Sequence, residues 1–276
     1  MDIIENIHGS VVQHGQHNSR VYLMRLNTDD TQTLISILDD LALKNSCGKI
    51  LAKIPAPVWN DFKSAGYVKE AVVPKFFKGQ TSGFFIAKYL SAERQKDESV
   101  KGLLNLVHQT PVGSINNKHR KSRVVRDVVP CKLSDAKEMS VIYQQVFESY
   151  PFPIQDPAYL ERIMIKGALY FCLRVEREIV AISAIEIDSE NKNAEMTDFA
   201  TLPKWQGMGF AGMLLKHMDK EVRKLGIKTA YTIARAESHG MNLVFKNNGY
   251  NYAGILRNNS NICGNIQSMT VWYKHL

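Results

Sequence analysis

The segment with the clearest potential for chemistry is a glycine-containing hexapeptide in the second half of the chain. It comprises Gln206, Gly207, Met208, Gly209, Phe210 and Ala211. A strand-like stretch at 194–200 precedes it, and the apolar pattern predicts a helix at 210–224, so the glycines lie at a strand-to-helix turn. Glycine lets the backbone approach a ligand closely, and the N–H groups at a helix N-terminus attract anions. The pattern predicts a site for a phosphate or pyrophosphate.

This turn differs from two other phosphate-binding loops. It lacks the Gly-Lys-Ser/Thr ending of a P-loop, and no G-x-G-x-x-G follows the first strand of a βαβ unit. A kinase or a dehydrogenase is therefore not expected. The order of motifs instead resembles the GCN5-related N-acetyltransferase (GNAT) family over residues 123–276. The resemblance rests on Gln206-x-x-Gly209-x-Ala211, with Leu202-Pro203 before it and Asn242, Gly249 and Tyr250 after it.

The resemblance implies a fold and a cofactor site. The fold would be α/β (α+β), with a mixed sheet flanked by helices. Acetyl-CoA would be the co-substrate, its pyrophosphate held by the backbone amides of residues 206–211. The pantetheine arm would pair with the strand end, and the amine would enter from the opposite side. The remaining expected cofactor contacts are Phe199, Ala200, Thr201, Asn242 and Phe245.

Acetyl transfer to an amine requires a group that removes a proton, because an alkyl ammonium has a pKa of ~10.4. Glu195 lies eleven residues before Gln206, a spacing that resembles the base of histone-acetylating family members. Asp198 lies on the other face of a regular strand unless a bulge re-aims it. We expect one of these two carboxylates to face the substrate. Many family members use a tyrosine as general acid where this chain has Phe245, so the acid stays open, with Tyr231, Tyr250 and Tyr273 as substitutes.

Segments in both halves also resemble the β-lysine N6-acetyltransferases within this family. They are 9–15, 194–203, 238–242 and 266–274. The product implied is N6-acetyl-β-lysine, a compatible solute, whereas the residues alone predict only acetylation of an amine. A diamino acid needs a partner for its carboxylate and an acidic group for one ammonium. The candidates for substrate binding are Tyr150, Phe152, Arg235, Glu237 and Arg257.

The first half repeats the end of the second in reduced form. A helix with Leu34 and Leu38 on one face precedes strands at 49–54, 67–73 and 83–89. The second half ends with a helix and strands at 229–234, 250–256 and 268–273. Both contain the pattern Phe-Lys-x-x-Gly-Tyr, at 62–67 and 245–250. We interpret 1–92 as a smaller, degenerate GNAT-like domain with a structural or substrate-shaping role, 93–122 as a partly helical linker, and 123–276 as the catalytic domain.

Composition limits the remaining classes. The 276 residues carry a net charge of +8, and the densest basic run, 118–126, lacks interleaved aromatic residues. It is interpreted as a linker, so no nucleic-acid partner is expected. No apolar run approaches the ~20 residues of a membrane span, and a cytoplasmic location without a membrane partner is expected.

No metal site is expected either. The four cysteines form no Cys-x-x-Cys pair, and the early histidines have no Cys or carboxylate at ligand spacing. The expected partners are acetyl-CoA and a small-molecule amine. Acetylation of a polyamine, another amino acid or a protein amine, and an acetyl-CoA sensor without turnover, stay open as alternatives. The oligomeric state, a homodimer included, is also open.

Overall fold

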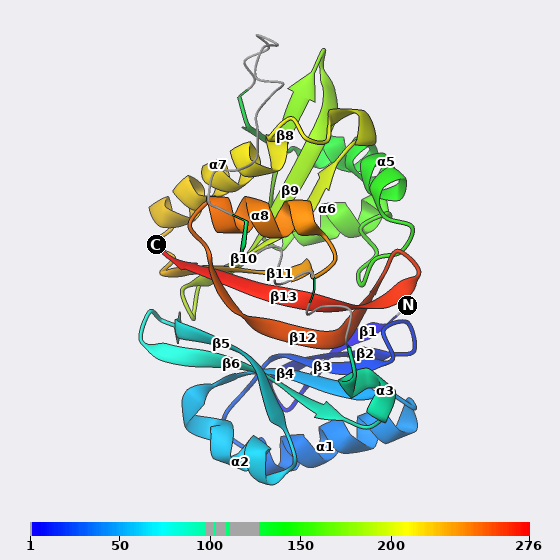
Figure 1. Cartoon of the computed structure of the whole chain (residues 1–276), viewed down its shortest axis with the longest axis vertical. Helices are drawn as coiled ribbons and strands as arrows, with labels where there is room; N and C mark the ends of the chain where they lie inside the picture. Colours follow the sequence, from blue (N-terminus) through cyan, green and yellow to red (C-terminus); the bar gives the residue numbers. More distant parts are fainter. Residues whose placement is uncertain (1, 98–101, 103–108, 111–126) are drawn as a thin grey trace.

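A computed structural model describes residues 2–97, 102, 109–110 and 127–276. Within this part of the chain, one 13-stranded mixed sheet runs through the molecule in the order β1-β2-β3-β4-β6-β5-β12-β13-β11-β10-β9-β8-β7. The first six strands form one end of the sheet and the last seven form the other (Figure 1). None of the described helices is long and apolar enough to span a membrane.

The second half forms the larger end of the molecule. Its strands are β7 Val129–Pro130, β8 Leu169–Val175, β9 Glu178–Asp188, β10 Asn193–Thr201, β11 Thr229–Arg235, β12 Asn251–Ile262 and β13 Asn265–His275. Its helices are α5 Ala136–Val146, α6 Pro157–Ile165, α7 Phe210–Lys224 and α8 His239–Asn247, with short 3-10 turns at Leu133–Asp135 and Pro203–Trp205. Strands β7 to β10 pair antiparallel, and β10 pairs with β11 in parallel.

The two faces of this sheet carry separate cores. On one face α7 buries an apolar stripe that includes Leu214, Met218 and Val222. On the other face α5 and α6 pack with the strands and with the first half of the chain. Strand β9 is buried on both faces from Ile179 to Ile185, which explains its nearly continuous apolar sequence. The site described below lies on the face toward the first half.

The first half is the smaller end. Its strands are β1 Ile3–Ile7, β2 Ser10–Gly15, β3 Arg20–Arg25, β4 Lys49–Pro55, β5 Val68–Phe77 and β6 Thr81–Tyr89. Its helices are α1 Thr31–Lys44, α2 Trp59–Ser64 and α3 Ala92–Gln95, with a 3-10 turn at Ala56–Val58. Helices α1 and α2 lie on the outer side of this end of the sheet (Figure 1). Leu34 and Leu38 of α1 are buried against the strands, as the apolar pattern predicted.

The two halves share one strand order. The run β1-β2-β3-β4-β6-β5 corresponds to β8-β9-β10-β11-β13-β12, and each run contains one parallel pair at the same place. In both, Tyr follows a short helix and a left-handed glycine: the Tyr67 N–H donates to the Phe62 carbonyl at 3.1 Å, and Tyr250 donates to Phe245 at 3.1 Å. The ring centroids lie 5.2 Å apart in the first pair, Phe62 and Tyr67, and 5.4 Å apart in the second, Phe245 and Tyr250.

A second repeated detail links each long helix to its sheet. Lys88 Nζ on β6 donates to Asp39 of α1 at 2.7 Å, and Lys274 Nζ on β13 donates to Asp219 of α7 at 2.7 Å. Both lysines are the penultimate residues of equivalent strands. The repetition of topology and of these contacts supports the proposed duplication.

The halves meet where β5 pairs with β12. Gly254 is in register with Ala71, and a Cβ added to Gly254 would overlap the backbone of Glu70 and Ala71. A glycine is therefore required for this close approach. Beside it, the buried Lys49 ammonium lies 2.7 Å from Glu70 Oε2 and donates to the Arg257 carbonyl at 2.7 Å. The ion pair belongs to the first half, and the hydrogen bond from Lys49 to Arg257 joins it to the second half.

Most predicted elements are present, and α7 has the predicted bounds. Strands β1, β2 and β3 and helix α6 were not predicted. The sequence also predicts a strand at 124–129, of which residues 127–129 are described and only Val129 lies in a strand. The basic run at 118–126, and nearly all of a second segment with helical potential at 102–108, lie outside the described residues. The domain limits stay a prediction.

Candidate active site

The glycine turn leads directly into α7. Gly207 and Gly209 have φ values of 77° and 81°, in the left-handed region that favours glycine. Gly209 is the N-cap residue of α7, and no side chain caps the helix. The positive end of the helix dipole thus faces an exposed turn, a suitable place for a pyrophosphate. Phe210 anchors the helix start by stacking on Trp205 with centroids 6.0 Å apart.

Gln206 contributes to the turn differently from the prediction. Its backbone N–H donates to the Pro203 carbonyl at 3.2 Å, and its side-chain Nε2 donates to the Thr201 carbonyl at 3.2 Å. The Gln206 amide is therefore engaged within the protein. We correct its predicted role. Gln206 shapes the turn, and the backbone N–H groups of residues 207–211 stay the candidates for binding the pyrophosphate.

Next to the turn, strands β10 and β11 separate. They pair in parallel through Asn193, Ala194 and Glu195, and a bulge follows in β10 between Thr197 and Ala200. The gap holds a small cavity of 80 Å³. Its lining includes Thr197, Phe199, Arg235, Ser238 and Phe245. A strand edge without a partner, beside a phosphate-binding turn, fits an extended pantetheine arm.

Two predicted cofactor residues on α8 have different surroundings. Phe245 borders the small cavity and packs edge-on against Phe199 at 5.6 Å. Asn242 is 0% exposed. Its Nδ2 donates to three backbone carbonyls, including that of Ser238 at 2.8 Å, and its Oδ1 accepts from Thr270 and Trp272 at 2.6 and 2.9 Å. Asn242 therefore fixes α8 to the sheet, which corrects its predicted contact with the cofactor.

Asp198 occupies the bulge, with φ of 54°. Its two carboxylate oxygens accept hydrogen bonds from the hydroxyls of Tyr150 and Tyr170 at 2.8 and 3.0 Å, and its backbone carbonyl accepts from Tyr143 at 3.1 Å. Burial raises the pKa of Asp198, while these hydroxyls oppose the shift. The bulge does re-aim the side chain, but toward tyrosines. Asp198 thus holds Tyr150 in place, and because it also lines the small cavity, its role as a base stays a prediction.

A larger cavity of 510 Å³ lies between the two halves. It shares Tyr150, Thr197 and several apolar residues with the small cavity, so the two adjoin. Its polar lining comes from both halves of the chain: Arg20, Tyr22, Arg25, Lys53, Glu186, Asp188, Glu190, Glu195, Tyr231, Asn259 and Ser260. Because it adjoins the small cavity between the separated strands, it is the candidate site for the acceptor amine.

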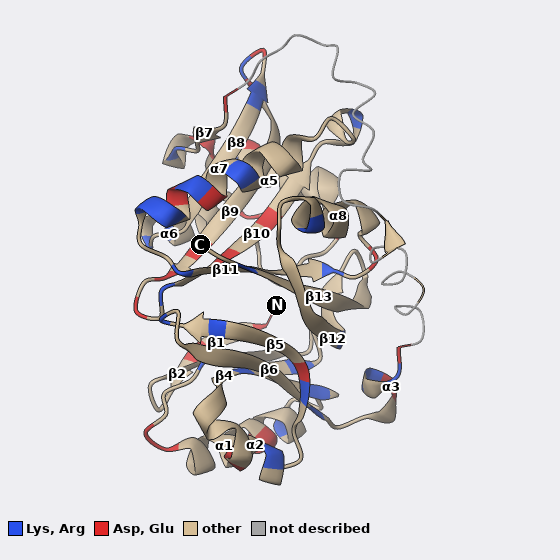
Figure 2. Cartoon of the chain, turned by 60° about the vertical axis from the view of Figure 1, so that its left-hand side comes forward, with Lys and Arg blue, Asp and Glu red and all other residues tan. Residues whose placement is uncertain are grey.

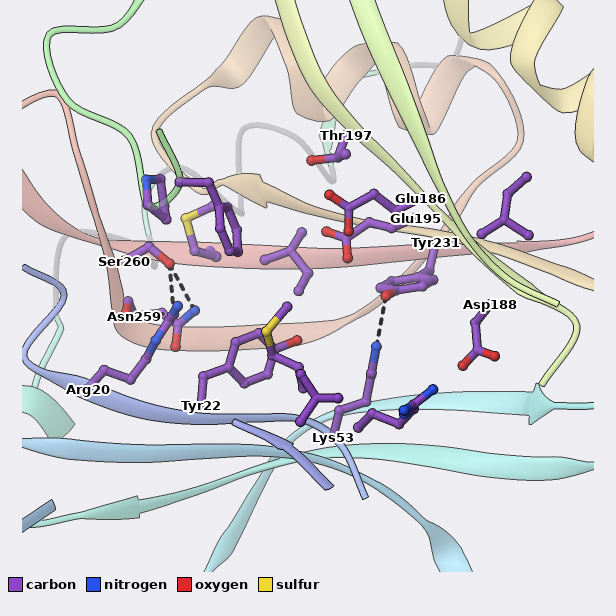
Figure 3. Close-up of a pocket in the computed structure, with 18 of the residues that line it drawn as sticks. Arg20, Tyr22, Lys53, Glu186, Asp188, Glu195, Thr197, Tyr231, Asn259 and Ser260 are labelled. Carbon is purple, nitrogen blue, oxygen red and sulfur yellow. Dashed lines mark hydrogen bonds between the residues drawn. The ribbon is translucent and has the colours of Figure 1, made fainter. Parts of the chain in front are cut away.

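The carboxylates of this cavity lie on neighbouring strands. Glu195 on β10 is in register with Glu186 on β9, and both side chains face the cavity (Figure 3). Figure 2 shows that acidic residues lie on β9 and β10. Burial and the nearby carboxylates raise the pKa of Glu186, and burial raises that of Glu195. A carboxylate with a raised pKa is a stronger base, which suits removal of an amine proton.

A lysine from the first half acts electrostatically on these carboxylates. Lys53 Nζ on β4 donates to the Tyr231 hydroxyl on β11 at 3.0 Å (Figure 3). Burial lowers the pKa of Lys53, and the charges of Glu195, Asp188 and Glu186 oppose that shift. In return, the Lys53 charge and the Tyr231 hydroxyl hold down the pKa of Glu195. The two halves therefore share one electrostatic cluster.

The remaining predicted substrate residues divide into two groups. Tyr150 and Phe152 line the large cavity, and Arg235 lines the small one. Glu237 is exposed and is not among the lining residues of either cavity. Arg257 is exposed near the seam of the two halves, its backbone N–H donates to Glu70 at 2.8 Å, and it lines neither cavity. The substrate roles of Glu237 and Arg257 stay a prediction.

Sequence reasoning missed the cavity residues of the first half and Glu186. Alternation along β9 and β10 could have placed Glu186 opposite Glu195. No motif marks Arg20 or Lys53. Among the described residues, no group of three or more His, Cys, Asp or Glu side chains could hold a metal ion.

Comparison with known families agrees with this geometry. The model of the acetyltransferase (GNAT) family matches residues 139–250, which include the parting strands, the glycine turn and α8. The protein is an N-acetyltransferase that uses acetyl-CoA.

Two curated relatives match nearly the whole chain. The β-lysine N(6)-acetyltransferase of Methanococcus maripaludis is 34% identical over 274 residues, covering 99% of each chain. That of Methanosarcina mazei is 26% identical and covers 89% of this chain and 97% of its own. Among solved structures, the ribosomal-protein-S18-alanine N-acetyltransferase from Escherichia coli aligns over 55% of this chain and 94% of its own, with a TM-score of 0.48 and 18% identity. The chain belongs to the GNAT family.

Proposed function

We propose that the protein acetylates the N6 amine of β-lysine and so produces N6-acetyl-β-lysine, a compatible solute. The observation that carries this proposal is that both named relatives match the first half as well as the catalytic half, and that the first half supplies one wall of the acceptor cavity. An enzyme for a small diamino acid needs such an enclosed site, with charges of both signs.

In this proposal Glu195 removes the proton from the N6 ammonium. Glu195 is the last residue of β10 that pairs with β11 before the two strands separate. It is therefore next to the position that the acetyl group would occupy. Glu186 beside it has a pKa raised to about 8, and an ammonium in the cavity would favour its ionised form. Tyr231 and Lys53 orient the Glu195 carboxylate and keep it ionised.

Acetyl-CoA supplies the acetyl group as a thioester. Residues 207–211 would hold its pyrophosphate, and the free edge of β10 at Phe199 would hold its pantetheine arm. Phe245 has no hydroxyl to donate, so we propose that the leaving thiolate, with a model thiol pKa of ~8.5, departs without a dedicated acid on α8. The packed rings of Phe245 and Phe199 would exclude water from the thioester sulfur when acetyl-CoA is bound.

The test is release of coenzyme A thiol by the purified protein with acetyl-CoA and a panel of amines: β-lysine, α-lysine, spermidine and a basic peptide. We expect the highest kcat/KM with β-lysine, and mass spectrometry should place the acetyl group on N6. A preference for spermidine or the peptide would show that the acceptor is a different amine, while the reaction would still be acetyl transfer to an amine. Tight acetyl-CoA binding without turnover on any amine would instead indicate a sensor.

A further inference from the structure

The acceptor cavity is electrically polarised along its length. Figure 3 shows Arg20, Asn259 and Ser260 at one end and Glu186, Glu195, Tyr231 and Lys53 at the other. At the acidic end, Lys53 is surrounded by carboxylates that compensate its charge. At the other end the only charged side chain of the three labelled is the Arg20 guanidinium. The cavity therefore offers different chemistry to the two ends of one ligand.

Arg20 is a buried cation without an ionic partner. Its side chain belongs to a residue that is 3% exposed, and none of the ion pairs among the described residues includes it. Burial lowers its pKa to about 10, so it stays protonated at neutral pH. A buried charge without a counter-ion is costly to the folded state. A ligand carboxylate in the adjoining cavity would supply the missing charge.

The hydrogen bonds of Arg20 leave part of the guanidinium free. Its Nη1 donates to the Asn259 carbonyl and to Ser260 Oγ, both at 2.9 Å, and its Nη2 donates to Gln13 Oε1 at 3.0 Å. Within the described part of the chain, Nε is buried and has no hydrogen-bond partner. Arginine has five N–H donors and binds a carboxylate through two of them. These fixed neighbours leave Nε as a donor for a ligand.

Asn259 adds an acceptor at the same end. It is 1% exposed and lines the cavity, and its Nδ2 donates to Ser260 Oγ at 3.2 Å. Its Oδ1 is buried and, among the residues described, has no partner. An unpaired buried carbonyl oxygen costs free energy unless a donor reaches it. An ammonium close to the ligand carboxylate would satisfy it.

We propose that Arg20 and Asn259 form the subsite for the carboxylate and the neighbouring ammonium of the acceptor, which makes the first half of the chain the part that selects an amino acid. This inference rests on the proposed function, because it assigns the two ends of β-lysine to the two ends of the cavity. The 3-ammonium of a β-amino acid lies two carbons from the carboxylate and would contact Asn259 Oδ1.

The experiment compares β-lysine with an analogue lacking only the carboxylate, 1,4-diaminopentane, in the full-length enzyme. We expect the wild type to prefer β-lysine by about 10- to 100-fold in kcat/KM, the value of a hydrogen bond to a charged group. In Arg20→Gln this preference should disappear while kcat/KM for 1,4-diaminopentane is retained. Arg94→Gln is the matched control, because Arg94 is also a buried arginine of the first half but lies off the cavity.

The Asn259 arm uses 6-aminohexanoate, which keeps the carboxylate and lacks the 3-amine. Asn259→Leu should reduce the preference of the enzyme for β-lysine over this analogue. Equal kcat/KM for β-lysine and 1,4-diaminopentane in the wild type would overturn the subsite, even if Arg20→Gln failed to fold. Activity on β-lysine without a preference over 1,4-diaminopentane would contradict only this inference. Activity on spermidine or the peptide alone would contradict the proposed function.

Discussion

The two halves of the molecule use the same scaffold but treat the start of the long helix differently. In the first half, Asp30 caps α1, and its carboxylate accepts a hydrogen bond from the Thr33 N–H at 3.1 Å. In the second half, Gly209 takes the cap position of α7 and no side chain fills it. A helix N-terminus attracts one anion. In α1 that anion belongs to the protein, whereas in α7 the position is left for a ligand.

The central strands show a second difference. The third parallel pair of each half joins Glu195 to Tyr231 in the second half and Tyr22 to Leu51 in the first. Glu195 and Tyr22 line the same cavity. Beyond this pair β3 continues alongside β4, while β10 bulges and leaves β11. The proposed base and the open strand edge therefore both belong to the second half, and we propose that the first half recognises the acceptor.

The largest effect should come from the residue that distinguishes the central strands. Glu195→Gln removes the proposed base but keeps the shape of the side chain, so kcat should fall by about 10²- to 10⁴-fold. Affinity for acetyl-CoA, measured by calorimetry, should hardly change. The wild-type kcat/KM should decline as the pH falls through the raised pKa of Glu195, above the ~4.3 of an ordinary glutamate, because the base must be ionised.

The control for this variant is Glu178→Gln, which changes an exposed glutamate at the far end of β9. It should leave kcat and the pH profile unchanged. If Glu195→Gln retained more than half of the wild-type kcat, the base would have to be another group, and Glu186 would be the first to test.

An intermediate effect should follow from closing the open helix. Gly209→Asp places a carboxylate at the start of α7, as Asp30 does in α1, and aspartate tolerates the left-handed backbone better than most residues. Its charge would repel the pyrophosphate. We expect the KM for acetyl-CoA to rise about 10- to 100-fold in steady-state assays, with less change in kcat at saturation.

Gly209→Asn is the matched control, because asparagine has the same shape without the charge. The difference in KM between the two variants measures the electrostatic part alone, and it should shrink as salt is added. In the mirror experiment, Asp30→Ala should lower the melting temperature and leave the KM for acetyl-CoA unchanged. Equal KM values for the Asp and Asn variants would remove the anion site from α7.

The sequence predicted the elements with strong local signals and missed those set by tertiary contact. Helix α7 was predicted with its observed bounds because its apolar residues recur at helical spacing and glycines flank it. The partners of Asp198 could not be predicted, since the tyrosine hydroxyls that bind its carboxylate come from distant parts of the chain. Arg20 and Lys53 carry no motif. Their position in the cavity follows only from the meeting of the two halves.

The smallest expected effect tests whether the first half influences the chemistry of the second. Lys53 lies beside Glu195 and lowers its pKa, so Lys53→Met should raise that pKa. The acid limb of the kcat/KM profile should then move to higher pH by about one unit, the scale of one nearby charge. Lys53→Arg keeps the charge and should leave the limb close to its wild-type position.

Lys69→Met is the control for Lys53→Met, because it also removes a lysine charge from the first half. Lys69 lies on β5 over the Trp59 and Phe84 rings, away from the cavity. It should not move the limb. If the acid limb of Lys53→Met moved to lower pH instead, the Lys53 charge would not be lowering the pKa of Glu195, and the prediction would be wrong. No shift at all, with Lys53→Met folded, would confine the first half to binding the acceptor and leave the proton transfer to residues of the second half.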